Sequence, residues 1–175
     1  MPKVILETPR LLLREMTWDD LDFIAAMLAD PLVMRHYPNT FTRDESRAWL
    51  QKVLDRYRDH GYALWLVETR GKVQPIGQVG LMQQHIDGVD EAEIGYLIHS
   101  LFWRQGYAVE AAAGVRDHAF SSLNKDRVIS LILPANIPSQ RVALRLGMKP
   151  EKVSKFRNSD SLVYSLARDS HPAKA

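Results

Sequence analysis

Cysteine is absent from the 175-residue sequence. This absence excludes disulfide bonds, thiolate metal sites and a cysteine nucleophile, and it suits a reducing compartment. Any covalent intermediate would have to form on another residue type. The 6 histidines show no spacing typical of a metal site, and neither a His-Glu-x-x-His pattern nor a phosphate-binding P-loop pattern occurs. We therefore expect no metal cofactor.

Long hydrophobic runs are missing as well. No apolar stretch approaches the roughly 18 residues that a membrane-spanning helix needs. Residues 1–7 lack the long apolar centre of a signal peptide. We therefore predict a cytoplasmic protein with no membrane partner.

A large excess of one charge sign is also absent, since 23 Lys and Arg stand against 21 Asp and Glu, for a net charge of +2. Nucleic-acid-binding domains carry clustered basic charge, so we expect no nucleic-acid partner and only a small, local site for any anionic ligand. With 46% hydrophobic and 25% charged residues, the composition is that of a globular protein. We predict one domain over residues 1–167 and a disordered tail over 168–175.

The sequence does contain a regular succession of helix and strand signals. Capping patterns, Pro and Gly mark the ends of four predicted helices. These helices lie between Thr17 and Pro31, between Thr42 and Gly61, over 108–122 and over 138–147. Segments rich in β-branched and aromatic residues predict strands at 10–15, 62–69, 76–84, 92–98, 127–133, 148–153 and 162–167.

The order of these elements predicts the sheet topology. The strands from 62 to 98 are separated by short turns, which is typical of an antiparallel meander. The strand at 92–98, the helix after it and the strand at 127–133 form a right-handed crossover, which makes those two strands parallel neighbours. We therefore predict an α/β protein with a mixed, mostly antiparallel sheet of six to seven strands, flanked by about four helices.

The most informative stretch is 103–112, which reads Trp-Arg-Gln-Gly-Tyr-Ala-Val-Glu-Ala-Ala and opens a helix after a strand. Gly106 has no Cβ, so the backbone can come close to a ligand there. The helix start leaves unpaired N–H groups and a partial positive charge, which favour a phosphate. A turn glycine without a ligand is the other interpretation.

This stretch resembles the pyrophosphate-binding motif of the Gcn5-related N-acetyltransferase (GNAT) superfamily, Gln/Arg-x-x-Gly-x-Gly/Ala. Gly106 and Ala108 occupy the last two fixed places, whereas Trp103 occupies the first. An aromatic residue in that place is similar to the RimJ/RimL-like branch, the ribosomal-protein alanine acetyltransferases. The element order over 11–166 is also similar to that of the GNAT acyl-CoA N-acyltransferase fold.

Two further segments carry the resemblance. Residues 92–98 resemble the fourth strand of the family, and residues 136–148 resemble its Asn-x-x-Ser and Lys-Leu-Gly-Phe region. Arg145 and Met148 stand where Lys and Phe are common in the family.

The resemblance implies acetyl-coenzyme A as cosubstrate, bound between two parallel strands that part near their ends. It implies that the pantetheine arm pairs with the backbone of Tyr96, Leu97 and Ile98. It implies that the pyrophosphate binds the amides of Arg104, Gln105, Gly106, Tyr107, Ala108 and Val109. The side chain of Asn136 is expected near the arm or the thioester, although capping its own helix is an alternative role for an Asn beside Pro138.

Acetyl transfer to an amine needs a base for the amine proton and an acid for the departing thiolate. Glu93 is the candidate base by resemblance, and an ordinary strand charge is its alternative role. Ser139 is the candidate acid, matching a Ser of the RimJ/RimL-like branch, although a first-turn hydroxyl can simply satisfy the backbone. His99, at the end of the same strand, is a competing base.

These residues lead us to expect an N-acetyltransferase that moves acetyl from acetyl-coenzyme A to a primary amine directly, in a ternary complex. The resemblance suggests a protein N-terminus as acceptor. It also suggests the loop at 34–38 as part of the acceptor cleft, and an ordinary connecting loop is the alternative interpretation. A polyamine, an amino acid or an amine-bearing antibiotic is the alternative acceptor, and a non-catalytic acetyl-coenzyme A sensor is the alternative class. A homodimer is compatible with the sequence, which leaves the oligomeric state open.

Overall fold

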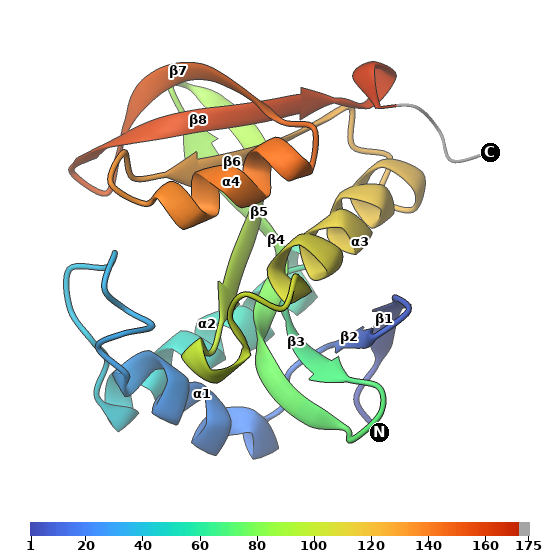
Figure 1. The fold of residues 1–175 in the computed structure, drawn as a ribbon, viewed down its shortest axis with the longest axis vertical. Helices are drawn as coiled ribbons and strands as arrows, with labels where there is room; N and C mark the ends of the chain where they lie inside the picture. Colours follow the sequence, from blue (N-terminus) through green and yellow to red (C-terminus); the bar gives the residue numbers. More distant parts are fainter. Residues whose placement is uncertain (172–175) are drawn as a thin grey trace.

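The computed structural model describes residues 1–171, which form a sheet covered by helices on both faces (Figure 1). The eight strands are β1 (Val4–Glu7), β2 (Leu11–Arg14), β3 (Leu64–Thr69), β4 (Gln74–Ile86), β5 (Val89–Ile98), β6 (Arg127–Ile132), β7 (Lys149–Phe156) and β8 (Ser159–Ala167). The α-helices are α1 (Leu21–Ala29), α2 (Arg43–His60), α3 (Tyr107–Ser121) and α4 (Ile137–Arg145). Short 3-10 turns are η1 (Trp18–Asp20), η2 (Ser100–Phe102) and η3 (Arg168–Ser170).

The strands are ordered β1-β2-β3-β4-β5-β6-β8-β7 across the sheet. All neighbours are antiparallel except β5 and β6, which are parallel. The predicted mixed, mostly antiparallel sheet and its parallel crossover through α3 are therefore confirmed. The sheet has eight strands rather than seven because Val4–Glu7 adds an edge strand that pairs with β2.

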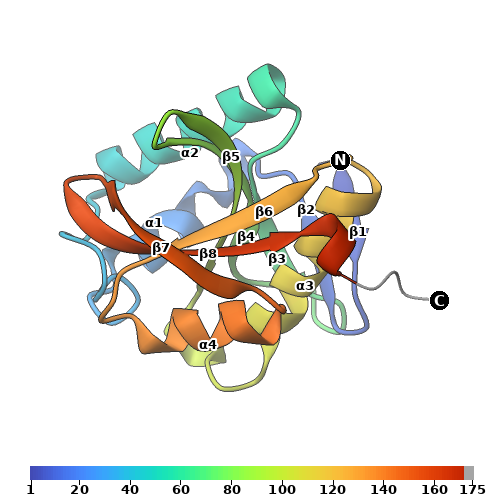
Figure 2. The same ribbon diagram turned by 90° about the horizontal axis from the view of Figure 1, so that it is seen from above.

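The helices lie on the sheet in pairs, with α1 and α2 on one face and α3 and α4 on the other (Figure 2). Each pair covers its own apolar cluster. Trp65 on β3 belongs to the cluster under α3 and α4, whereas its neighbour Leu66 belongs to the cluster under α1 and α2. Successive strand residues point to opposite faces, so a stretch of strand buried on both faces is continuously apolar, as residues 64–67 of β3 are.

The helix ends were predicted from capping patterns, and the structure contains the hydrogen bonds that these patterns imply. The Thr42 hydroxyl accepts the N–H of Glu45 at 3.2 Å, and the Glu45 carboxylate accepts the N–H of Thr42 at 2.7 Å. Gly61 ends the same helix with a φ of 76°, a conformation that favours glycine. The capping box at Thr17 and Asp20 is likewise present.

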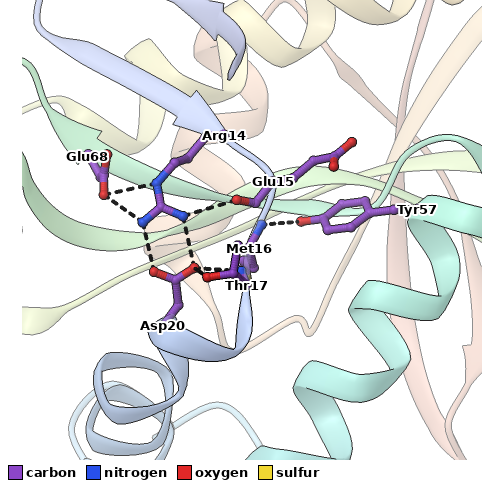
Figure 3. Close-up of polar contacts among 7 residues, drawn as sticks. All are labelled: Arg14, Glu15, Met16, Thr17, Asp20, Tyr57 and Glu68. Carbon is purple, nitrogen blue, oxygen red and sulfur yellow. Dashed lines mark hydrogen bonds and ion pairs between the residues drawn. The ribbon is translucent and has the colours of Figure 1, made fainter. Parts of the chain in front are cut away.

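A buried charge cluster joins the start of α1 to the sheet (Figure 3). The Arg14 guanidinium donates to both carboxylate oxygens of Asp20, at 2.9 and 2.8 Å, and to one oxygen of Glu68, at 3.1 and 2.8 Å. The three side chains are only 14%, 9% and 10% exposed. Arg14 is therefore the counterion of two carboxylates that have little contact with water.

Replacing Arg14 by Met should destabilise the protein strongly, because both carboxylates would stay buried without a counterion. Breaking a buried ion pair in this way costs about 3–5 kcal/mol of unfolding free energy. Urea denaturation measures this loss of unfolding free energy. The matched control is Arg58→Met, since Arg58 also pairs with two acids but is 71% exposed, and exposed pairs contribute about 0–1 kcal/mol. Equal losses in the two variants would contradict this account of the cluster.

The chain end is described only in part. Of the predicted tail at 168–175, residues 168–170 form η3, and Arg168 pairs with Asp126 at 2.6 Å. Residues 172–175 lie outside the described residues. Within residues 1–171, none of the helices has both the length and the apolar character required to cross a membrane.

Candidate active site

The sheet opens between its two parallel strands. Strands β5 and β6 are in register at only one pair, Glu93 with Ile129, and the Ser130 hydroxyl adds a bond of 2.8 Å to the Ile94 carbonyl. Beyond this point, residues 95–98 stay paired with β4 but, within residues 1–171, have no ladder partner on the β6 side. Backbone polar groups need partners, so this free edge is suited to a ligand that carries amides of its own.

The anion-binding candidate lies at the far end of this free edge. Arg104 and Gly106 both have positive φ, at 61° and 79°, and Gly106 is the N-cap of α3. The first intrahelical bond is donated by Glu110 to the Gly106 carbonyl, at 3.0 Å. The N–H groups of residues 107–109 precede that bond, and residues 104–106 are exposed. The donors and the positive helix end therefore fit a diphosphate.

Trp103 ties this loop to the strand before it. Its indole N–H donates to the Ile98 carbonyl at 2.7 Å, and the Arg35 guanidinium lies 4.9 Å from its ring centre. The Ile98 carbonyl thus already has one protein donor. Of the three residues expected to pair with a pantetheine arm, Tyr96 and Leu97 lie on the part of the edge that Trp103 does not reach.

Tyr96 bridges the gap toward α4. Its hydroxyl donates to the Ser139 carbonyl at 2.7 Å. Burial raises the pKa of Tyr96, so the phenol stays protonated and can donate at neutral pH. The Ser139 amide in turn donates to the Asn136 side chain at 3.2 Å, so Asn136 does cap α4. The bridge brings Ser139 and Asn136 next to the open edge of β5.

Glu93 lies where the two strands part and is 7% exposed. Gln84, on β4, donates to its carboxylate at 2.7 Å. Burial raises the pKa of Glu93 to about 7, although hydrogen bonds from Gln84 and the Leu131 backbone lower it, as does the charge of Arg157. A carboxyl group with that pKa is partly ionised at neutral pH and can accept a proton there.

Tyr37 brings the loop between α1 and α2 toward Glu93. Desolvation together with the Glu93 charge raises the pKa of Tyr37. Arg157, in the turn between β7 and β8, acts electrostatically on both groups. In both views that loop and the β7–β8 turn lie at the same side of the molecule, on the left (Figures 1 and 2). The loop at 34–38, expected from the sequence to line an acceptor cleft, therefore lies near Glu93.

His99 is placed differently. Its Nδ1 atom accepts the N–H of Leu101 at 3.3 Å, which caps η2, and its ring lies 6.4 Å from that of Phe23. It follows Glu93 by six residues on an extended strand, a distance of about 20 Å. Glu93 and His99 are therefore alternatives rather than partners at one amine.

The sequence alone does not reveal the role of several residues of the site. It predicts only that Gln84 lies in a strand and that Arg10 begins one. The structure places Arg10 against Glu110, 100 positions away, at 2.6 Å. No local pattern links residues so far apart. Within residues 1–171, no group of three or more His, Asp and Glu side chains is arranged to hold a metal ion.

Comparison with known proteins agrees with this geometry. Residues 10–149 match the model of the acetyltransferase (GNAT) domain. The uncharacterized N-acetyltransferase YoaA of Bacillus subtilis is 31% identical over 175 residues, which cover 94% of this chain and 97% of that protein. The acetyltransferase from Agrobacterium tumefaciens superposes with a TM-score of 0.82 at 26% identity, covering 93% and 94% of the two chains.

A RimL ribosomal L7/L12 alpha-N-protein acetyltransferase, solved in complex with coenzyme A, superposes with a TM-score of 0.77. Its identity is 18%, over 97% of this chain and all of that one, so this likeness concerns the fold. The mixed sheet with its parted parallel strands is thus the GNAT fold.

Proposed function

Because the chain belongs to the GNAT acetyltransferase family, we propose that it transfers the acetyl group of acetyl-coenzyme A to the amino terminus of a protein. Enzymes of this family use acetyl-coenzyme A. The observation that supports the proposal best is the position of Glu93, buried at the point where β5 and β6 part. Its pKa of about 7 suits a base that works at neutral pH.

The roles of the residues follow from their places along the gap. The amides of residues 104–109 would bind the diphosphate, and the open edge of β5 would pair with the pantetheine arm. From Ile98 to Glu93 this edge spans about 17 Å. The arm would therefore carry the thioester, which supplies the acetyl group, toward Glu93.

The chemical step needs no covalent enzyme intermediate. The amine nitrogen would form a bond to the acetyl carbon, which places a negative charge on the acetyl oxygen, and the carbon–sulfur bond would break as this tetrahedral adduct collapses. Glu93 would accept the amine proton, directly or through a water, and the Ser139 hydroxyl would give a proton to the departing thiolate. Amide donors near the Ile94 end of the edge would stabilise the oxyanion.

The choice of a protein N-terminus is supported by the RimJ/RimL-like pattern around Trp103 and Ser139, and by the fold shared with RimL. A panel of acceptors tests it. Purified protein and acetyl-coenzyme A would be incubated with N-terminal peptides of ribosomal proteins, polyamines, amino acids and aminoglycosides, and release of free coenzyme A would be followed. We expect turnover with peptides that have a free α-amino group and none with the same peptides blocked at that group.

Turnover with a small amine alone would contradict the protein acceptor but keep the acetyltransferase. Binding of coenzyme A without turnover of any amine would favour the sensing module instead.

A further inference from the structure

Arg10 lies in the β1–β2 turn and contacts the loop at 103–107, which is the candidate diphosphate-binding loop. Its Nε donates to the Glu110 carboxylate at 2.6 Å, and its backbone N–H donates to the other oxygen at 2.9 Å. Its Nη1 donates to the Gln105 carbonyl at 2.9 Å. Its guanidinium carbon lies 4.6 Å from the centre of the Tyr107 ring. One side chain thus contacts the loop, the first residue of α3 and the first turn of the helix.

The loop needs such support because its backbone is strained. Arg104 is not a glycine, yet its φ is 61°, and Gly106 follows with a φ of 79°. The Arg104 conformation persists only where surrounding contacts hold it, whereas a glycine adopts a positive φ readily. Trp103 supplies one contact through the Ile98 carbonyl, the Gln105 side chain supplies a long one to the Leu101 carbonyl at 3.4 Å, and Arg10 supplies another through the Gln105 carbonyl. Without Arg10, the loop would be free to relax to a shape in which its amides no longer converge.

Arg10 also balances a charge that would oppose an anion. Glu110 lies in the first turn of α3, only 17% exposed. Burial raises the pKa of Glu110, but hydrogen bonds from Thr8 and Arg10 and the Arg10 charge lower it below its ordinary value overall, so Glu110 is ionised at neutral pH. A bare carboxylate in this place would repel phosphate groups. Paired with Arg10, it instead serves to orient the guanidinium.

We infer that Arg10 is a positioning residue for the cofactor: held by Glu110, which also accepts a hydrogen bond from the Thr8 hydroxyl at 2.6 Å, it fixes the loop at 103–107 in the shape that binds the diphosphate. This inference rests on the proposed function, because it assumes that the loop binds coenzyme A. The inference adds the β1–β2 turn to the cofactor site.

The test is the affinity for coenzyme A of the variant Arg10→Gln, measured by calorimetry. We expect the dissociation constant to rise about 10- to 100-fold, because hydrogen bonds to charged groups of this kind are lost together with the loop shape. With the best amine of the acceptor panel, KM for acetyl-coenzyme A should rise by a similar factor, while kcat at saturation stays within about twofold. Arg10→Lys should not restore affinity, since one ammonium group cannot reproduce the forked contacts.

Arg70→Gln is the matched control. Arg70 is as exposed as Arg10, at 48%, and also bonds the β1–β2 turn, through the Thr8 carbonyl at 3.1 Å. No contact of Arg70 with residues 103–107 is present in the described part of the chain. Its replacement should therefore leave the dissociation constant of coenzyme A unchanged.

The variant Glu110→Gln separates orientation from charge. If Glu110 orients Arg10, this variant also weakens coenzyme A binding, and the double variant is no worse than Arg10→Gln alone. Tighter binding in Glu110→Gln, unchanged binding in Arg10→Gln or an equal loss in Arg70→Gln would each overturn the inference. Failure of the wild-type protein to bind coenzyme A would instead reject the proposed function.

Discussion

The variant Glu93→Gln is expected to lower kcat by about 10²- to 10⁴-fold, the range that a general base contributes. Its dissociation constant for coenzyme A should stay within about twofold of the wild-type value, because Gln keeps the size of the side chain and an oxygen for Gln84. The matched control is Asp90→Asn, on the same strand, whose side chain is 69% exposed; it should leave kcat unchanged. Normal turnover in Glu93→Gln would remove Glu93 from the role of base.

The same variant should be more stable than the wild type at high pH. Burial raises the pKa of Glu93 from 4.5 to about 7, so the folded protein favours the neutral acid. Between pH 4.5 and 7 the unfolded chain loses its proton first, and the free energy of unfolding therefore falls as the pH rises through this window. At pH 8 the ionisation of Glu93 has lowered the unfolding free energy of the wild type by about 3 kcal/mol.

Glu93→Gln cannot ionise and would escape this loss. Urea denaturation at pH 5 and pH 8 should show the variant gaining stability relative to the wild type at the higher pH only. In the wild type, kcat/KM should rise with pH through about 7, because the base must lose its proton before it can work. Equal stability differences at both pH values would contradict the burial of an ionisable Glu93.

The variant Gly106→Val should lose about 100-fold or more in affinity for coenzyme A. A β-branched residue at a φ of 79° is strained. A Cβ there would also lie 3.4 Å from Nη2 of Arg10, which holds the loop. The backbone strain would displace the first amides of α3, and the added side chain would keep the diphosphate from coming close to them. Calorimetry with coenzyme A measures the effect.

Gly61→Val is a close control for that variant. Gly61 has a φ of 76° at the end of α2, and a Cβ there would meet no atom within 4 Å. Both variants carry the same backbone strain, so both should lose about 1–2 kcal/mol of unfolding free energy. Only Gly106→Val should lose coenzyme A affinity. If Gly61→Val lost as much affinity, the effect would be one of general stability.

The elements set by local interactions could be predicted from the sequence. The capping boxes at Thr17 and Thr42 and the stop at Gly61 each depend on residues within one helical turn, and the structure contains them. The parallel crossover from β5 to β6 followed from element order and handedness alone. The edge strand Val4–Glu7 was missed because it is short and shows no clear alternation, and its pairing with β2 shifts register.

The site could be predicted only as far as residue types and their order allow. Glu93 could be placed on a strand, but its burial and its raised pKa depend on its place between β4 and β6 and on the distant charge of Arg157. The clamp between Arg10 and Glu110 joins residues 100 positions apart, which no local pattern reveals. Long-range side-chain contacts of this kind need the packed structure.

The central claim is that the gap between β5 and β6, closed at one end by the start of α3, binds coenzyme A. Calorimetric titration of the intact protein with coenzyme A tests it most directly. We expect one molecule bound per chain, with a dissociation constant between about 1 μM and 1 mM, the range typical of enzyme substrates. Gly106→Val should weaken this binding by about 100-fold or more in the same titration. No binding to the wild-type protein at millimolar coenzyme A would contradict the claim and the roles derived from it.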